Sequence, residues 1–165
     1  MICPACEHDN LPGVEECENC QHPLSPLDLP QPTRGLQKRI LEGTVSELKP
    51  RPAIAVAPDA SVSSAVELMQ ANKIGCVLVQ AAGSLAGILT EKALLKSVGL
   101  RLKELPSIQV KEVMDPHPVA LTEKSTIAFA FHTMSVGDSR YVPVLRNDRS
   151  LGIISVRDLL RYLCK

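Results

Sequence analysis

Four of the six cysteines lie close together near the start of the chain. Cys3 and Cys6 form one Cys-x-x-Cys pair, and Cys17 and Cys20 form a second pair after ten intervening residues. Four thiolates on two tight turns can surround a tetrahedral Zn²⁺ ion and close its coordination, which is the arrangement of a structural zinc site. We therefore predict a structural Zn²⁺ ion bound by these four cysteines.

The composition around this cluster limits its function. Residues 1–33 hold six of the 18 acidic residues and none of the 18 basic ones, which leaves +6 for residues 34–165. A segment without cations is poorly suited to nucleic-acid phosphates. Iron is the alternative metal, but residues 1–22 contain no aromatic side chain and do not favour electron transfer. His8 and His22 could substitute as ligands, although four cysteines suffice. The spacing resembles a short zinc ribbon, which indicates a folding module or a protein-docking site.

A second group of chemical residues lies in the stretch "GIISVRDLL", residues 152–160. Gly152 allows close backbone approach, and Ser155 stands between a strand-like and a helix-like run, where a hydroxyl and free N–H groups can bind phosphate. Asp158, one turn later, can accept hydrogen bonds from ribose hydroxyls. The same residues are also an ordinary helix start, with Ser155 as cap and Asp158 near the positive end of the helix dipole. The motif alone leaves both interpretations open.

An earlier stretch, "GILTEKALL" at residues 87–95, has the same pattern with one decisive difference. Thr90 corresponds to Ser155, but Ala93 stands where Asp158 is expected, and Gly75 stands where the second stretch has Arg140. Loss of a hydrogen bond to a charged group costs about 1.5–3 kcal/mol. We therefore expect one competent binding site per chain.

The two stretches belong to an internal repeat with an offset of 65 residues and no gap. Identical pairs include Val45/Val110, Glu47/Glu112, Ala65/Ala130, Met69/Met134, Val77/Val142, Val79/Val144, Gly87/Gly152, Ile88/Ile153, Leu94/Leu159 and Leu95/Leu160. A period of this length in two copies indicates a duplicated domain rather than a solenoid.

Each copy predicts the element order β-α-β-β-α. The expected strands are 54–56, 76–79 and 86–89 in the first copy and 119–121, 141–145 and 151–154 in the second. The first helix of each copy covers 62–69 or 127–134, with Asp59, or Glu123 with Ser125, as start signals, and the second helix covers 94–98 or 159–163. Because one unit buries only one face of its small sheet, we expect an α/β (α+β) fold with two units packed about a pseudo-two-fold axis.

Residues from about Thr44 onward resemble a tandem pair of CBS domains, called a Bateman module. The resemblance is carried by "VSEL" and "VKEVM", by the central strands "CVLV" and "YVPVL", and by the two stretches quoted above. We expect a zinc ribbon at 1–22, a proline-rich linker and short helix at 23–43, and CBS repeats at 44–100 and 101–165. Thr33 is a possible N-cap of the short helix, and Gly43 ends it.

The resemblance implies an adenosine-containing ligand in the cleft between the repeats: AMP, ADP, ATP, NAD or S-adenosylmethionine. Asp158 would bind the ribose, and Arg140, joined by Arg157 if it turns inward, would face a phosphate. Adenine would lie among aliphatic side chains and main-chain amides. The expected ligand-binding residues are Ile54, Ile74, Gly75, Val119, Ser139, Arg140, Gly152, Ile153, Ser155, Arg157 and Asp158.

These observations predict a non-enzymatic regulatory protein that forms a homodimer through its CBS module and signals to an unidentified protein partner. Cys76 and Cys164 have no histidine or acid at catalytic spacing. No signal peptide or membrane span is evident, so we expect a cytoplasmic protein, with nucleic acid a disfavoured partner. The alternative is a structural adaptor that dimerises through the repeats, docks through the ribbon and uses no nucleotide.

Overall fold

The computed structural model describes residues 2–3, 5–11, 13–24, 35–97, 99, 104–146 and 151–164. The chain divides into two compact units, Met1–Lys38 and Arg39–Lys165. Most of the expected proline-rich linker, together with Thr33, falls on residues 25–34 and so lies outside the described residues.

The first unit consists of two turns of the same construction, 14 residues apart. In each turn the N–H group of a cysteine donates to a histidine carbonyl at 2.9 Å, Cys3 to His8 and Cys17 to His22. Isolated β-bridges close the turns between Ile2 and Asp9 and between Glu16 and Pro23. Cys3, Cys17 and Leu24 form its small buried core.

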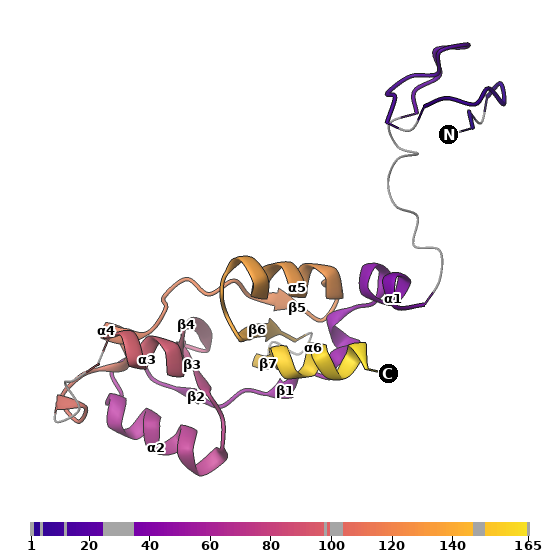
Figure 1. Ribbon diagram of the computed structural model, residues 1–165. Coiled ribbons are helices and arrows are strands. Elements are labelled where there is room, and N and C mark those ends of the chain that lie inside the picture. The colour runs from indigo at the N-terminus through magenta and orange to yellow at the C-terminus, as the bar shows by residue number, and fades with distance from the viewer. Residues whose placement is uncertain are drawn as a thin grey trace. The chain divides into compact units, whose positions relative to one another are not determined.

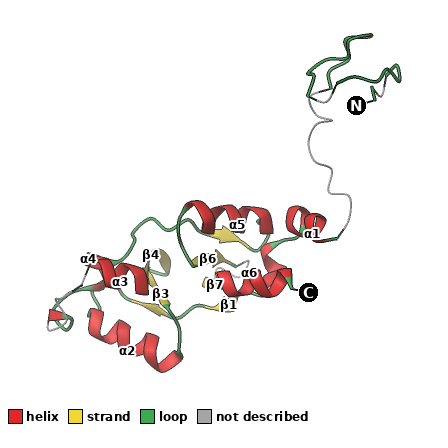
Figure 2. Cartoon of the chain, in the orientation of Figure 1, coloured by secondary structure: helices red, strands yellow, loops and turns green. Residues whose placement is uncertain are grey.

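The second unit contains both repeats (Figures 1 and 2). The first repeat contains β2 (Ala55–Val56), α2 (Val62–Asn72), β3 (Cys76–Ala81), β4 (Ser84–Thr90) and α3 (Glu91–Ser97). The second contains β5 (Leu121–Thr122), α5 (Ile127–Val136), β6 (Tyr141–Leu145), β7 (Leu151–Ser155) and α6 (Val156–Leu163). The predicted order β-α-β-β-α is confirmed in both copies. No helix among the described residues has the length and apolar character required to cross a bilayer.

The starts of α2 and α5 differ from the sequence prediction. Ser61 caps α2 by accepting a hydrogen bond from the Ser64 N–H, and Thr126 caps α5 by accepting one from the Phe129 N–H, both at 3.1 Å. The predicted start signals lie one to three residues too early, because a cap must reach the N–H three residues ahead. The Ser125 hydroxyl instead accepts the Thr122 N–H at 3.0 Å within the preceding turn.

Each repeat begins with a segment that joins the other repeat. We call residues 44–53 and 109–118 the N-terminal segments; they contain the 3₁₀-helix η2 (Val45–Leu48) with β1 (Arg51–Pro52), and α4 (Val110–Val113), respectively. Strand β1 pairs antiparallel with β7, giving a second-repeat sheet of order β1-β7-β6-β5. Reciprocally, Asp115 bridges Ile88 in β4, beside the first-repeat sheet β2-β3-β4.

The cores show the same exchange. Val45 and Leu48 are buried with the second-repeat residues around Leu121 and Ile127, whereas Val110 and Val113 are buried with the first-repeat residues. A third apolar cluster lies where the sheets meet and includes Leu78 and Ile88 from the first repeat and Ile153 from the second. The two repeats therefore interlock, and their sheets pack on each other.

The short helix α1 (Leu36–Glu42) ends before Gly43, as the sequence predicts. Within the second unit, the Arg39 guanidinium donates to the Tyr162 carbonyl at 2.6 Å and lies 4.7 Å from the centre of the Tyr162 ring. The end of α1 is therefore attached to α6.

Candidate functional site

The Asp158 carboxylate lies in the first turn of α6, directly after strand β7. Ser155 is the N-cap, and its N–H and Oγ donate to Asp158 Oδ2 at 2.8 and 2.7 Å. The Ser155 side chain faces the backbone of the first turn in return, which completes a capping box. Asp158 is only 8% exposed. The helix-start interpretation of the motif is thus realised in the structure, whatever else the carboxylate binds.

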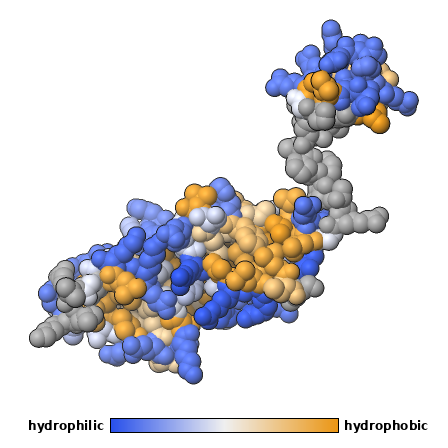
Figure 3. All heavy atoms as spheres, in the orientation of Figure 1, coloured by the Kyte–Doolittle hydropathy of each residue, from blue (hydrophilic) through white to orange (hydrophobic). Residues whose placement is uncertain are grey.

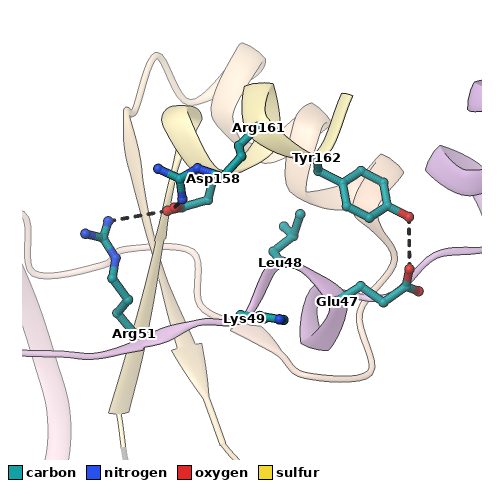
Figure 4. A pocket seen from close by; sticks show the side chains of 7 residues that line it. All are labelled: Glu47, Leu48, Lys49, Arg51, Asp158, Arg161 and Tyr162. Carbon is teal, nitrogen blue, oxygen red and sulfur yellow. Dashed lines mark hydrogen bonds and ion pairs between the residues drawn. The ribbon is translucent and has the colours of Figure 1, made fainter. Parts of the chain in front are cut away.

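Two arginines also contact this carboxylate (Figure 4). Arg51 Nη2 lies 3.5 Å from Asp158 Oδ2, and Arg161 Nη1 lies 3.3 Å from Oδ1. Both arginine side chains are mostly exposed, so each pair contributes little to stability. Sequence reasoning missed them. The i, i+3 spacing of Arg161 on the helix is a usable signal, whereas Arg51 arrives through the pairing of β1 with β7.

The two repeats enclose a cleft of about 1000 Å³ at this place. It is lined by the following residues of the expected ligand set: Ile54, Ile74, Gly75, Arg140, Ile153, Ser155, Arg157 and Asp158. The cleft therefore combines aliphatic surface from both repeats with the polar groups at the start of α6.

Three residues of the expected set do not line the cleft. Val119 is 56% exposed elsewhere, and the Ser139 hydroxyl donates to the Tyr141 carbonyl at 2.8 Å. Gly152 lies against β1: a Cβ added there would be 3.2 Å from Pro50 Cβ. The missing side chain thus admits a neighbouring strand.

Tyr141 and Glu91, which the sequence reasoning did not select, also line the cleft. A Cβ added to Gly75 would overlap the Tyr141 hydroxyl and lie 2.8 Å from the Glu91 carboxyl carbon, so both side chains lie directly against Gly75. Burial, and then the Glu91 charge, raise the pKa of Tyr141. The same two causes raise the pKa of Cys76 to about 12, which keeps that thiol protonated and unreactive.

The corresponding end of the first repeat has a hydroxyl but no carboxylate at the equivalent position. Thr90 Oγ1 accepts the Ala93 N–H at 3.2 Å, as a cap does, while Ala93 is partly buried against the first-repeat core. The charged lining differs accordingly. Arg51 and Arg161 contact the Asp158 carboxylate, Arg140 and Arg157 also line the cleft, and Glu91 and Lys73 are the charged lining residues from the body of the first repeat.

A smaller pocket of about 120 Å³ lies on the α1 side of Asp158 and shares Arg51, Asp158 and Arg161 with the cleft. Within it the Tyr162 hydroxyl donates to Glu47 Oε2 at 3.0 Å (Figure 4). The Thr44 N–H, and then this hydroxyl, lower the pKa of Glu47.

In the first unit, the four predicted cysteines converge. The sulfur atoms of Cys3, Cys6, Cys17 and Cys20 all lie within 4.8 Å of one another, a spread that fits a tetrahedral ion with metal–sulfur bonds of about 2.3 Å. Zn²⁺ at this place would satisfy all four thiolates and fix both turns.

Neighbouring groups shift the pKa values of these thiols in different directions. A backbone hydrogen bond at His22 lowers the pKa of Cys20, but the hydrogen bond with Cys6 and burial outweigh it and raise that pKa to about 12. Burial raises the pKa of Cys17, but hydrogen bonds from the backbone of Cys20 and Asn19 and from the Asn10 side chain help to bring it down to about 6. The buried Asn10 also links the turns, donating to the His8 carbonyl and accepting the Glu18 N–H, both at 3.0 Å. Sequence reasoning missed Asn10, which carries no motif signal.

Comparison with known proteins agrees with this geometry. The family model described as "CBS domain" matches residues 45–99 and 110–165. A CBS domain-containing protein of Arabidopsis thaliana, CBSCBSPB3, is 32% identical over 95 residues, which are 58% of this chain and 17% of that protein. The chain therefore spans only a small part of this curated relative.

Two solved structures illustrate the similarity. A CBS-domain containing protein from Agrobacterium tumefaciens is 34% identical, with a TM-score of 0.64 over 72% of this chain and 94% of that one. CBSX2, solved in complex with AMP, is 25% identical, with a TM-score of 0.62 over 73% and 96% of the two chains. The two matched segments cover most of the chain, and on this basis it belongs to the CBS-domain family.

Proposed function

We propose that the chain is a non-enzymatic regulatory protein that binds an adenine nucleotide at the Asp158 end of the cleft. The observation that carries the proposal is the position of Asp158: a nearly buried carboxylate in the wall of a cleft of about 1000 Å³, contacted by Arg51 and Arg161, with Arg140 and Arg157 also in the lining. CBS-domain proteins, some of them crystallised with AMP, support a nucleotide-sensing role.

In this proposal, the ribose hydroxyls donate to the Asp158 carboxylate and take the place of Arg51 and Arg161. Arg140 and Arg157 face the phosphate, and the base lies against Ile54 and Ile153, which line the same cleft. AMP, ADP, ATP, NAD and S-adenosylmethionine all carry the adenosine that this arrangement recognises. Because Ala93 cannot accept ribose hydrogen bonds, we expect the Thr90 end to be empty or to bind a nucleotide only weakly.

The regulatory output passes through protein contacts. Exposed apolar side chains on α5 and α6, Phe129, Val136 and Leu160, support a homodimer formed through the CBS module. Figure 3 shows apolar surface gathered over this part of the molecule. Ligand binding shifts such an assembly only through different affinities for its two states. A protein partner that docks on the Cys₄ unit would then respond to the shift between the two states of the assembly.

A structural adaptor without a nucleotide is the second candidate. It is favoured by one observation: Ser155, Arg51 and Arg161 already satisfy the Asp158 carboxylate. In this alternative the Ser155–Asp158 motif serves only to cap the start of α6.

Thermal shift with a panel of adenosine compounds distinguishes the two. At about 100 times Kd, a ligand stabilises the fold by roughly 2.7 kcal/mol. We expect this shift for the wild type and not for Asp158→Ala. That variant also loses a cap contribution of about 0.5–2 kcal/mol, so it needs a control that loses a similar capping box away from the cleft.

Glu112→Ala is the matched control, because Glu112 Oε1 accepts the Gln109 N–H at 2.8 Å in a capping box of α4 and does not line the cleft. We expect Glu112→Ala to melt earlier and still respond to the nucleotide. Equal responses of wild type and Asp158→Ala would favour the adaptor, as would no response of the wild type to any compound.

A further inference from the structure

We propose that Glu91 determines ligand specificity: its carboxylate disfavours a second and third phosphate, so the cleft takes nucleoside monophosphates in preference to di- and triphosphates. This inference rests on the proposed nucleotide site at Asp158 and concerns a first-repeat residue in the lining of the same cleft.

Glu91 is held in place by the backbone at the beginning of α3. Its N–H donates to the Gly75 carbonyl at 3.0 Å, and its carboxyl carbon lies 2.8 Å from where a Gly75 Cβ would be. The 65-residue offset relates Gly75 to Arg140 and Glu91 to Val156. The first repeat therefore has no cation where the second has Arg140, and it has a carboxylate where the second has Val156.

The next residue does not neutralise this carboxylate from within the cleft. Lys92 forms its ion pair with Asp138, on the second-repeat turn before β6, and does not line the cleft. Lys73 and Arg51 are the lining cations from residues 44–100, and Arg140, Arg157 and Arg161 come from the second repeat. The arginines thus supply most of the positive charge of the lining, and Glu91 places a negative charge on its first-repeat side.

Tyr141 shows that Glu91 and the phosphate-facing arginines act on the same region. Its hydroxyl lies against Gly75 beside the Glu91 carboxyl group. Apart from burial, its pKa is raised by Glu91 and lowered by Arg157 and Arg140. A phosphate between these arginines has Glu91 as its nearest acidic neighbour toward the first repeat, and each added phosphate brings further negative charge to that side. At a separation of about 6 Å and an effective dielectric constant of about 40, repulsion between two unit charges weakens binding about tenfold.

Titration calorimetry of the full chain with AMP, ADP and ATP, without divalent cations, tests the inference. We expect the wild type to bind AMP more tightly than ATP. Glu91→Gln should tighten ATP binding about tenfold more than AMP binding and leave adenosine affinity unchanged, which also reports an intact cleft. S-adenosylmethionine, whose extension is cationic, should bind more weakly to Glu91→Gln.

Glu67→Gln is the matched control, because Glu67 is an exposed residue of α2 that does not line the cleft. It should keep the wild-type ratio of ATP to AMP affinity. A wild type that prefers ATP, or a Glu91→Gln variant with an unchanged ratio, overturns the assignment of Glu91 while leaving the nucleotide site intact. A wild type that binds none of these compounds overturns the proposed function and this inference with it.

Discussion

In the proposed complex, Asp158 must exchange partners when a ribose binds. Its Oδ2 atom already accepts from Ser155 and faces Arg51, and Oδ1 faces Arg161. The capping contacts come from within the helix and can remain, but the two guanidinium groups occupy the side from which ribose hydroxyls would approach. In the proposed complex the two arginines would therefore compete with the sugar for Asp158 while they attract the phosphate.

The competition predicts opposite responses to two ligands. In Arg51→Gln, adenosine should bind as much as about fivefold more tightly, because an exposed ion pair of up to about 1 kcal/mol no longer opposes ribose binding. The affinity for AMP should increase less than the affinity for adenosine, or should fall, because the phosphate loses a nearby cation. Calorimetry with both ligands measures this, and Arg140→Gln, which should leave adenosine affinity unchanged, is the control. Weaker adenosine binding by Arg51→Gln would contradict the competition.

At the residue scale, the sequence predicted what local motifs encode. The Cys-x-x-Cys pairs and the Ser155–Asp158 turn are set by spacing along the chain, and the structure brings each group together as expected. Arg51 and Glu91 could not be found in this way, because their place in the cleft depends on which strand and which glycine they meet. Gly152 had a local signal, close backbone approach, but the neighbour that approaches is β1.

At the scale of elements, α6 links the candidate site to α1 and η2, which precede the first repeat's sheet in the sequence. Asp158 stands in its first turn, and Tyr162, one turn later, contacts both Arg39 of α1 and Glu47 of η2. A change in the position of α6 on ligand binding would therefore be transmitted directly to α1.

Tyr162→Phe should destabilise the second unit by up to about 1 kcal/mol at neutral pH, because it removes a hydrogen bond to an exposed carboxylate and keeps the ring. The folded-state pKa of Glu47 is lowered, by the Thr44 N–H and then by Tyr162. Its contribution is thus present above the unfolded pKa of about 4.3 and is lost as the pH falls through the folded value. Urea unfolding at pH 7 and at pH 3 should show the difference from wild type narrowing in acid. A constant difference would mean that Glu47 is not the partner.

The β-α-β-β-α order was readable from hydrophobic periodicity, and most predicted bounds lie within a few residues of the observed ones. The pairing of β1 with β7 could not be predicted from the sequence. The dipeptide "RP" at residues 51–52 has no strand signal and gains its hydrogen bonds from the other repeat. Periodicity shows which face of an element is buried, but it does not show which copy buries it.

At the scale of the whole molecule, the two units have separate cores, so metal loss should affect one of them. Chelation, or Cys17→Ser, should make residues 1–24 sensitive to protease and leave the melting of the second unit unchanged. Elemental analysis should find about one zinc per chain in the wild type. Cys164→Ser, at an exposed cysteine outside the cluster, should retain the metal. Stoichiometric iron with visible absorbance would contradict the zinc assignment.

The exchange of N-terminal segments makes the duplicated chain unable to behave as two independent copies. A chain ending between the repeats would keep residues 44–53 without β7 to pair with, and would lack residues 109–118, whose Val110 and Val113 complete its own core. Neither half can reach its native minimum before the other is folded. The repeats should therefore unfold in a single transition, with folding limited by contacts distant in sequence. The duplicated chain should therefore behave as one cooperative unit with two halves, in which the equivalent positions Asp158 and Ala93 carry different side chains.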